Sequence, residues 1–188
     1  LWVLEHTLRF LAAHRESLPG QRFAINLAPS TVCRVPFPLE VSRLLAKYAI
    51  EPWQLIFEVT ECSTFGSGEQ ALHILQQLQK MGVRIAIDDF GTGYASYARL
   101  KSVDADILKI DGDFIRNIVN NSLDYQIVAS ICHLARMKKM LVVAEYVETE
   151  EIRSAVHALG IDYVQGYLIG RPAPLESLLE TEASCADA

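Results

Sequence analysis

Apolar residues along the chain form six short runs, and each run ends in a polar residue. The runs span residues 22–26, 55–61, 83–89, 106–111, 141–145 and 163–165. Nearly continuous runs of Ile, Val, Leu and Ala are typical of strands that are buried on both faces of a parallel sheet. The pattern therefore predicts six parallel strands whose polar ends meet at one edge of the sheet, where parallel barrels place their chemistry.

The segments between these runs carry apolar residues at helical spacing. Helices are predicted over residues 1–14, 36–49, 70–81, 121–137 and 149–159. Gly82 and Gly160 follow two of these segments, where a glycine in the left-handed conformation commonly ends a helix. The regular alternation of strand and helix predicts an α/β fold of the (βα)8 TIM type.

The length of the chain limits how much of such a barrel it can hold. A (βα)8 barrel takes about 250 residues, or at least about 200, whereas this chain has 188 residues and opens on a predicted helix. We therefore expect about six βα units here, with the chain truncated at its amino end and one or two strands upstream of Leu1. The domain is predicted over residues 1–180, and residues 181–188 are predicted to form an acidic tail.

Composition excludes several classes of protein. With 51% hydrophobic and 21% charged residues, the chain suits one globular domain. A net charge of −6 argues against sequence-independent binding to DNA or RNA, which needs many cationic contacts to phosphate. No apolar stretch approaches the length of about 20 residues that a membrane helix needs. Four cysteines without a CxxC pair suit a reducing compartment, so a cytoplasmic location is expected.

Two adjacent acids, Asp88 and Asp89, give the sharpest chemical signal. They end an apolar run and are followed by Gly91 and Gly93, which allow a tight turn. Carboxylates at the end of a buried strand are costly unless a cation compensates them, so this pair favours a divalent metal. The alternative is structural, because the two acids could cap a following helix beside a glycine turn.

Oxygen ligands recur at the ends of other predicted strands. Asn26, Glu58, Glu61 and Glu145 all stand at such positions. Carboxylate and amide oxygens suit Mg²⁺ or Mn²⁺ better than Zn²⁺. The five histidines all lie on predicted helices, so roles on helix surfaces are favoured for them over ligation.

A lysine, Lys109, lies two residues before Asp111 in the fourth apolar run, so the two side chains should share one face of the strand. A buried lysine among acids can serve only as an ion pair. In a barrel mouth it would offer positive charge to a phosphoryl transition state, and that role is preferred.

Five segments together resemble the successive signatures of the EAL-domain cyclic di-GMP phosphodiesterases. They span residues 57–61, 88–94, 108–111, 144–149 and 165–167, in the order and at the spacing of that family. The resemblance implies that Asn26, Glu58 and Asp88 bind one metal and that Asp88, Asp89 and Glu145 surround a second. It implies further that Lys109 contacts the attacking water or the scissile phosphate. Glu148 would hold the loop after Asp89, while Gln165, together with Asp111, would contact the dinucleotide.

The function implied by this resemblance is hydrolysis of cyclic di-GMP to linear pGpG in bacterial second-messenger signalling, with two Mg²⁺ or Mn²⁺ ions in the complete domain. Cyclic di-GMP is the expected ligand, and no DNA or RNA duplex is expected. Additional sensory or membrane domains are expected upstream. The sequence leaves open whether the protein forms a homodimer and whether the parent protein is anchored to the inner membrane. Two metals bridged by a shared carboxylate suit the cleavage of a phosphodiester.

Two departures from the family pattern leave alternatives open. The Glu-Ala-Leu signature, whose Glu is a metal ligand in the family, does not occur in this chain, and Tyr146 stands where the family usually has Gly. The signature is expected upstream, so that the chain by itself would hydrolyse the substrate poorly. If the signature is absent from the parent, the module would be a degenerate cyclic di-GMP receptor without turnover. An enolase-type barrel, which uses acids and a lysine to abstract a proton, is the further rival.

Overall fold

Six parallel strands form one sheet, and they are paired in the order in which they occur along the chain. The computed structural model describes residues 1–60, 68–91 and 104–179. Glu61, Gly93 and the predicted acidic tail at residues 181–188 lie outside this range. The strands are β1 (Phe23–Asn26), β2 (Leu55–Thr60), β3 (Arg84–Phe90), β4 (Ile107–Ile110), β5 (Leu141–Ala144) and β6 (Tyr163–Val164). All six predicted strands are thus confirmed to within two residues at each described end.

Among the described residues, one longer helix precedes β1 and four others connect successive strands, and each lies where a helix was predicted. They are α1 (Trp2–Ala13), α3 (Phe37–Tyr48), α5 (Gly68–Lys80), α8 (Ser122–Met137) and α9 (Glu150–Ala158). Within the described residues, the structure adds four short elements that were not predicted: α2 (Pro29–Val32), η1 (Pro52–Gln54), α7 (Gly112–Ile115) and η2 (Leu175–Ser177). Elements of three or four residues complete little more than one turn, so they show no hydrophobic period.

Helix ends follow local chemistry. Gly82 and Gly160 have φ values of 95° and 68°, which confirms their predicted left-handed conformation. Asn121 and Thr149 accept hydrogen bonds from backbone N–H groups of the first turns of α8 and α9. These four helix ends are therefore each fixed by a residue suited to the position. No helix within the described ranges is both long and apolar enough to cross a membrane.

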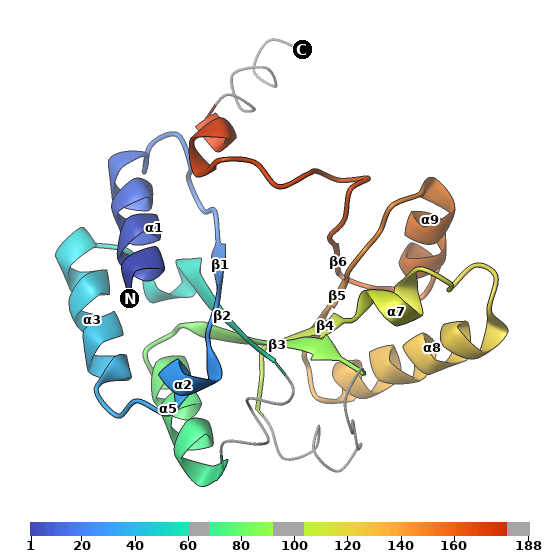
Figure 1. The fold of residues 1–188 in the computed structure, drawn as a ribbon, viewed down its shortest axis with the longest axis horizontal. Helices are drawn as coiled ribbons and strands as arrows, with labels where there is room; N and C mark the ends of the chain where they lie inside the picture. The colour runs from blue at the N-terminus through green and yellow to red at the C-terminus, as the bar shows by residue number, and fades with distance from the viewer. Residues whose placement is uncertain (61–67, 92–103, 180–188) are drawn as a thin grey trace.

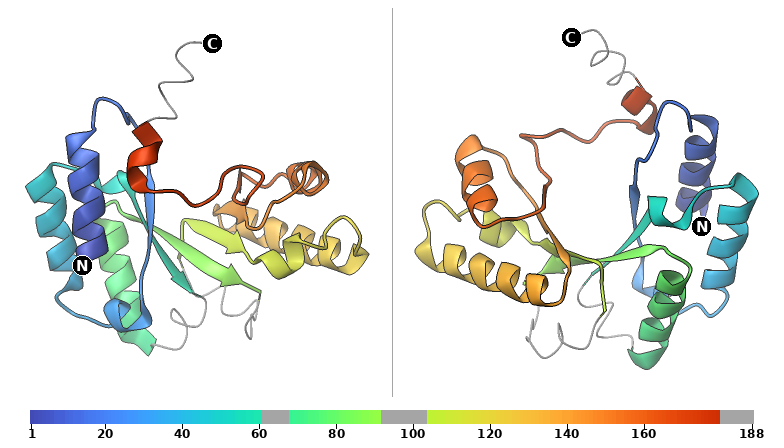
Figure 2. Two further views of the ribbon diagram at one scale, coloured as in Figure 1. Left: turned by 45° about the horizontal axis from the view of Figure 1, so that its top comes forward. Right: turned by 180° about the vertical axis from the view of Figure 1, so that it is seen from behind.

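The sheet is curled, and its helices lie outside it (Figure 1). The segment that follows β6 crosses back to the β1 side, where η2 lies beside β1 in both views of Figure 2. Within the described residues, β1 pairs only with β2, and β6 pairs only with β5. The six strands therefore make an open, curled part of a TIM-type barrel.

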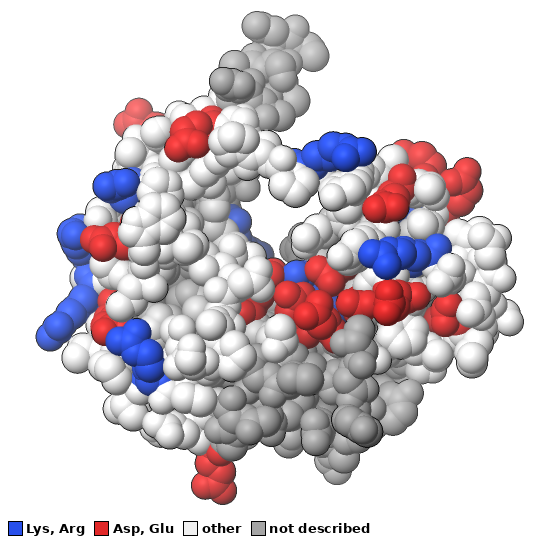
Figure 3. Space-filling model, viewed as in Figure 1, with Lys and Arg blue, Asp and Glu red and all other residues white. Residues whose placement is uncertain are grey.

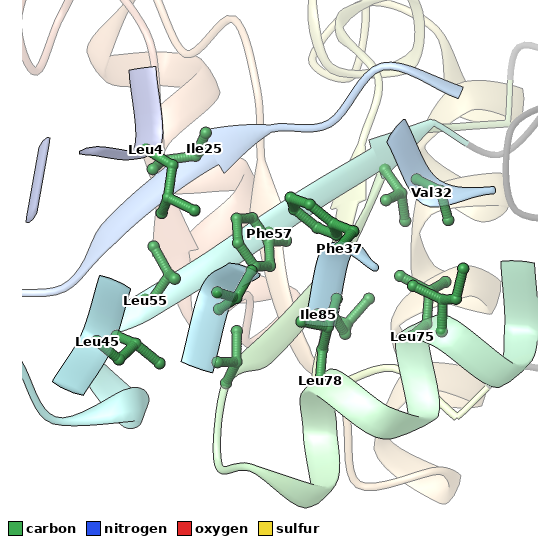
Figure 4. Close-up of a cluster of buried hydrophobic side chains, with 14 of the residues drawn as sticks. Leu4, Ile25, Val32, Phe37, Leu45, Leu55, Phe57, Leu75, Leu78 and Ile85 are labelled. Carbon is green, nitrogen blue, oxygen red and sulfur yellow. The ribbon is translucent and has the colours of Figure 1, made fainter. Parts of the chain in front are cut away.

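Two hydrophobic clusters hold the helices against the sheet. One joins β1, β2 and β3 to α1, α3 and α5, and Phe37 and Phe57 lie at its centre with ring centroids 5.6 Å apart (Figure 4). The other joins β3, β4, β5 and the segment after β5 to α7, α8 and α9. The strand β3 contributes to both clusters, so it is the structural link between the two halves.

Strand burial departs from the prediction in β1 and β2. The four residues of β4 are all buried, as continuous apolar runs predict, whereas β1 has only Ile25 buried. In β2, Leu55, Phe57 and Val59 are buried and alternate with partly exposed residues. The helices cover the outer face, while the inner face of these strands is open enough to admit polar side chains such as Glu58.

Candidate metal centre

A β-bulge in β3 presents both aspartates to the same neighbour. Ile87 pairs with Leu108 and Phe90 pairs with Ile110, so two residues of β3, Asp88 and Asp89, stand opposite one residue of β4, Lys109. Side chains alternate between faces in a regular strand, which would send the two carboxylates in opposite directions. The extra residue and the left-handed backbone of Asp89, at φ 55°, remove that alternation.

Three carboxylates meet at the carboxyl ends of the strands. Asp88, Asp89 and Glu145 each offer a ligand oxygen, and these oxygens all lie within 4.8 Å of one another. Asp88 and Glu145 are buried, while Asp89 is partly exposed. Figure 3 shows acidic side chains gathered near the centre of this face. The predicted convergence of these three residues is thus seen in the structure.

Lys109 lies at the centre of the acidic group. Its Nζ lies 2.8 Å from Oδ1 of Asp88 and 2.9 Å from Oε1 of Glu145. It also donates a hydrogen bond to Oε2 of Glu58 at 3.0 Å. With only 5% of its side chain exposed, this ammonium neutralises part of the negative charge of three strands.

The pKa values reflect burial and mutual repulsion. Burial raises the pKa of Glu58 and of Glu145, although Lys109 opposes this effect in both. Burial and the charges of Asp88 and Asp111 raise the pKa of Asp89. Burial favours the neutral amine of Lys109, but Asp88, Glu58 and Glu145 outweigh it and raise the pKa of Lys109, so the group stays charged.

Glu58 and Asn26 extend the site along the inner face of the sheet. Their Cα positions are paired between β1 and β2, and paired residues of adjacent strands point to the same face. Glu58 joins the acidic cluster through Lys109, whereas the Asn26 side chain is exposed and none of its described contacts reaches the cluster. The structure therefore supports a cluster of four acidic side chains more strongly than it supports Asn26 as a further metal ligand.

A cavity of about 200 Å³ opens on this inner face and holds three of the predicted site residues. Glu58, Lys109 and Gln165 line it together with Arg22. A larger cavity, of about 690 Å³, lies between α9 and β6 and contains none of the predicted site residues. The smaller cavity is therefore the relevant one, because it adjoins the charged cluster.

The remaining predicted residues have different surroundings. Asp111 lies just beyond β4 and caps α7, accepting a hydrogen bond from the Asp113 N–H at 2.7 Å, and its charge reaches Asp89. Glu148 is exposed, and the loop that it was predicted to hold lies mostly within residues 92–103, outside the described residues. Its role stays a prediction.

Two residues near the site were not among those predicted. Arg22 lines the cavity, and a reading of β1 at period two would have found it, because Arg22 and Asn26 are four residues apart. Gly112 lies under the ring of Tyr146 and leaves no room for a Cβ atom. Only the tertiary structure shows that contact, since the two residues are 34 positions apart in sequence.

The donor set fits a hard divalent cation. Oδ1 of Asp88 is buried and faces the ammonium of Lys109 at 2.8 Å, so this oxygen is directed into the cluster, where a cation compensates its charge. Three carboxylates at this spacing, with Glu58 beside them, supply oxygen ligands alone, as Mg²⁺ and Mn²⁺ prefer. Glu58, Asp88, Asp89 and Glu145 are the residues that could hold such ions.

Comparison with known proteins gives a consistent result. The family model described as "EAL domain" matches residues 1–172. The chain is 70% identical to cyclic di-GMP phosphodiesterase PdeF of Escherichia coli, over 97% of the chain and 24% of that protein. A structure of the PaMucR phosphodiesterase in complex with c-di-GMP is 39% identical, with a TM-score of 0.87 over 94% of this chain and 72% of that one.

A second solved structure, the EAL domain of Mycobacterium smegmatis DcpA, aligns with a TM-score of 0.90 at 29% identity, over 97% of this chain and 83% of that one. The fold of this chain is thus shared with both matched structures. The chain spans about a quarter of the length of two curated relatives from Escherichia coli, PdeF and PdeA.

Proposed function

The chain belongs to the EAL domain family, and on that premise we propose that it acts as a metal-dependent phosphodiesterase module that hydrolyses cyclic di-GMP to linear pGpG. The observation that carries the proposal is the cluster of Asp88, Asp89 and Glu145 around the ammonium of Lys109. The similarity to PdeF and to the ligand-bound MucR structure supports the choice of substrate.

The proposed metal ligands follow the two groups that the resemblance to the family implies. Asn26, Glu58 and Asp88 would hold one ion, and Asp88, Asp89 and Glu145 would hold another. Mg²⁺ or Mn²⁺ in these positions would lower the pKa of a bound water and neutralise charge on the phosphodiester. The short distances among Asp88, Asp89 and Glu145 support the second group more directly than the first.

Lys109 is proposed to stabilise the reacting phosphate. A charged amine fixed at a strand end contributes most where negative charge develops, on the phosphoryl oxygens of the transition state. Its three acidic neighbours keep it protonated and hold it in one place. Glu148 is proposed to position the loop after Asp89, and Gln165 and Asp111 to contact the dinucleotide. The position of Gln165 on the same cavity as Lys109 supports this assignment.

The test is direct. The chain and a longer parent protein that includes the upstream sequence are incubated with cyclic di-GMP and Mn²⁺, and pGpG is measured by chromatography. Hydrolysis that disappears in Asp88→Asn, and not in the exposed control Glu69→Gln on α5, supports the proposal. Binding of cyclic di-GMP without turnover in the parent would instead identify a receptor. The upstream sensory domains stay a prediction, and a homodimer and membrane anchoring of the parent stay open alternatives.

A further inference from the structure

Tyr146 directly follows the acid Glu145 and has a left-handed backbone, with φ 52°. A bulky residue rarely adopts this conformation, and it persists only where the surrounding structure holds it in place. The side chain is 45% exposed, so burial of the ring in the core does not account for the strain. A contact at the surface must hold it instead.

That contact is made by α7. Gly112, the first residue of α7, lies so close to Tyr146 that a Cβ atom added at residue 112 would overlap Cβ, Cγ and Cδ2 of the tyrosine. At the carboxyl end of the same short helix, Cζ of the C-cap residue Arg116 lies 4.0 Å from the centroid of the tyrosine ring, a cation–π distance. The ring therefore rests on α7 at two points.

The turn that carries Tyr146 is tied on both sides. The N–H of Glu145 donates to the carbonyl of Ile110 at 3.2 Å, and the N–H of Val147 donates to the carbonyl of Gln165 at 3.0 Å. Ile110 lies next to Lys109 and two residues before Gly112. The tyrosine thus joins the end of β5, with Glu145, to the end of β4, with Lys109, and these two side chains lie 2.9 Å apart.

We propose that Tyr146 and Gly112 form a matched pair that positions Glu145 for metal binding. The ring packs against α7 and so fixes the turn that follows β5. The absence of a Cβ atom at residue 112 lets the ring approach the helix this closely. Tyr146 and Gly112 act through Glu145 and need not touch metal or substrate themselves, so both are positioning residues. The inference rests on the proposed metal site. It gives a positioning role to Tyr146, the residue at which the sequence departs from the family pattern.

Four variants of the full chain test this pair: Gly112→Ala, Tyr146→Gly, the double variant and Tyr146→Phe. Mn²⁺ affinity is measured by calorimetry and by the electron paramagnetic resonance signal of free Mn²⁺, and folding is measured by circular dichroism. Gly112 has no left-handed backbone, so alanine there perturbs the protein chiefly through the tyrosine ring. Loss of groups that orient a metal ligand typically weakens affinity by about 10- to 100-fold.

We expect Gly112→Ala to weaken Mn²⁺ binding within that range, because the new methyl group displaces the ring and with it Glu145. Tyr146→Gly should also weaken Mn²⁺ binding, because the turn loses the ring that packs against α7, even though its backbone strain is relieved. Adding Tyr146→Gly to Gly112→Ala should produce no further loss, because both changes remove the same contact. Tyr146→Phe should bind Mn²⁺ as the wild type does, because it keeps the ring against Gly112 and Arg116.

Wild-type affinity in Gly112→Ala or in Tyr146→Gly would overturn the inference, and so would losses that simply add in the double variant. Should Gly112→Ala fail to fold, the contrast between Tyr146→Gly and Tyr146→Phe decides the question. Equal affinities in these two would again overturn it. A wild-type chain that binds no Mn²⁺ would refute the proposed metal site itself, so the two failures are distinguishable.

Discussion

The ammonium nitrogen of Lys109 lies 2.8 Å from Oδ1 of Asp88, and both side chains are buried. The contact is electrostatic, and it places the positive charge of β4 against the bulged part of β3. Glu58 and Glu145 complete the surroundings of the same ammonium. Lys109 thus has a structural part, which is to compensate the charge of the buried acids in the ligand-free protein. The chemical part is its proposed action on the reacting phosphate.

The structural part predicts that Lys109→Ala destabilises the metal-free chain. Removing one partner of a buried ion pair costs about 3–5 kcal/mol, because the remaining charges lose their compensation. Urea denaturation in the presence of EDTA measures this loss. The exposed control Lys80→Ala should change the free energy of unfolding by less than about 1 kcal/mol. Equal stabilities of the two variants would contradict the prediction.

The chemical part predicts that Lys109→Ala lowers turnover of cyclic di-GMP while largely preserving its binding. The benefit of the lysine is expected to grow in the transition state, so the loss should appear in kcat, by about 10²- to 10³-fold. The measurement is steady-state kinetics of the parent protein at saturating Mn²⁺. A variant with unchanged kcat would return Lys109 to a structural ion pair.

The acids should differ in their effect on metal binding. Asp88→Asn removes the charge of the central carboxylate, which contacts Lys109 and belongs to the cluster within 4.8 Å. We expect it to weaken Mn²⁺ binding more strongly than Glu58→Gln, because Glu58 contacts Lys109 but does not belong to the group of three carboxylates within 4.8 Å. Calorimetric titration of both variants measures the difference. The reverse order would place the metal nearer to β2.

The pH dependence follows from three raised pKa values. Burial raises the pKa of Glu58 and Glu145, and burial with the charge of Asp88 raises that of Asp89. A carboxylate must lose its proton to bind a metal. Mn²⁺ affinity should therefore fall as pH is lowered, starting above the ordinary carboxyl range of about pH 4. Calorimetry from pH 8 to pH 5 checks this, and a constant affinity would contradict it.

In the metal-free chain, lower pH should increase the free energy of unfolding, whereas it weakens Mn²⁺ binding. Carboxylates whose pKa is higher in the folded state than in the unfolded state bind more protons when folded, so the free energy of unfolding rises as pH falls through that window. Urea denaturation in EDTA at pH 7 and pH 5 should therefore show Glu58, Glu145 and Asp89 contributing added stability at the lower pH. The variant Glu58→Gln lacks the contribution of Glu58, so its free energy of unfolding should rise less between pH 7 and pH 5 than that of the wild type.

The core predicts a loss that is independent of the metal. Phe57 is fully buried on β2 and packs against Phe37 of α3. Phe57→Ala should cost about 3–5 kcal/mol, since it removes buried area and leaves a cavity. Urea denaturation with and without Mn²⁺ should give the same loss, because the ring faces the helices while its neighbour Glu58 faces the site. A loss that depends on Mn²⁺ would contradict this division between the faces.

Hydrophobic patterning predicted the βα order because each strand and long helix buries a continuous or periodic apolar surface. The same reasoning placed Asp88, Asp89 and Glu145 at strand ends on one side of the sheet. It could not predict that Asp88 and Asp89 face the same neighbour, since regular alternation separates them and the bulge depends on pairing with Lys109. Contacts between distant residues, such as Tyr146 with Gly112, likewise have no local signal.

The pairing of Asp111 with Lys109 shows a related limit. Spacing by two predicted a shared strand face, but β4 ends at Ile110 and Asp111 becomes the cap of α7. A strand of four residues and a helix of four residues follow one another too closely for periodicity to locate the boundary. The carboxylate still influences Asp89 through its charge.

The bulge in β3 makes the chemistry of this domain depend on the length of one strand, counted in residues. Deleting a single residue between Ile87 and Phe90 would restore regular pairing with β4, and the order of strands and helices and both hydrophobic clusters could survive it. The two-acid face opposite Lys109 would not. A descendant with that deletion would keep its architecture and its overall sequence likeness while losing the arrangement of acids. Spacing at this position is therefore a sharper marker of retained activity than overall similarity.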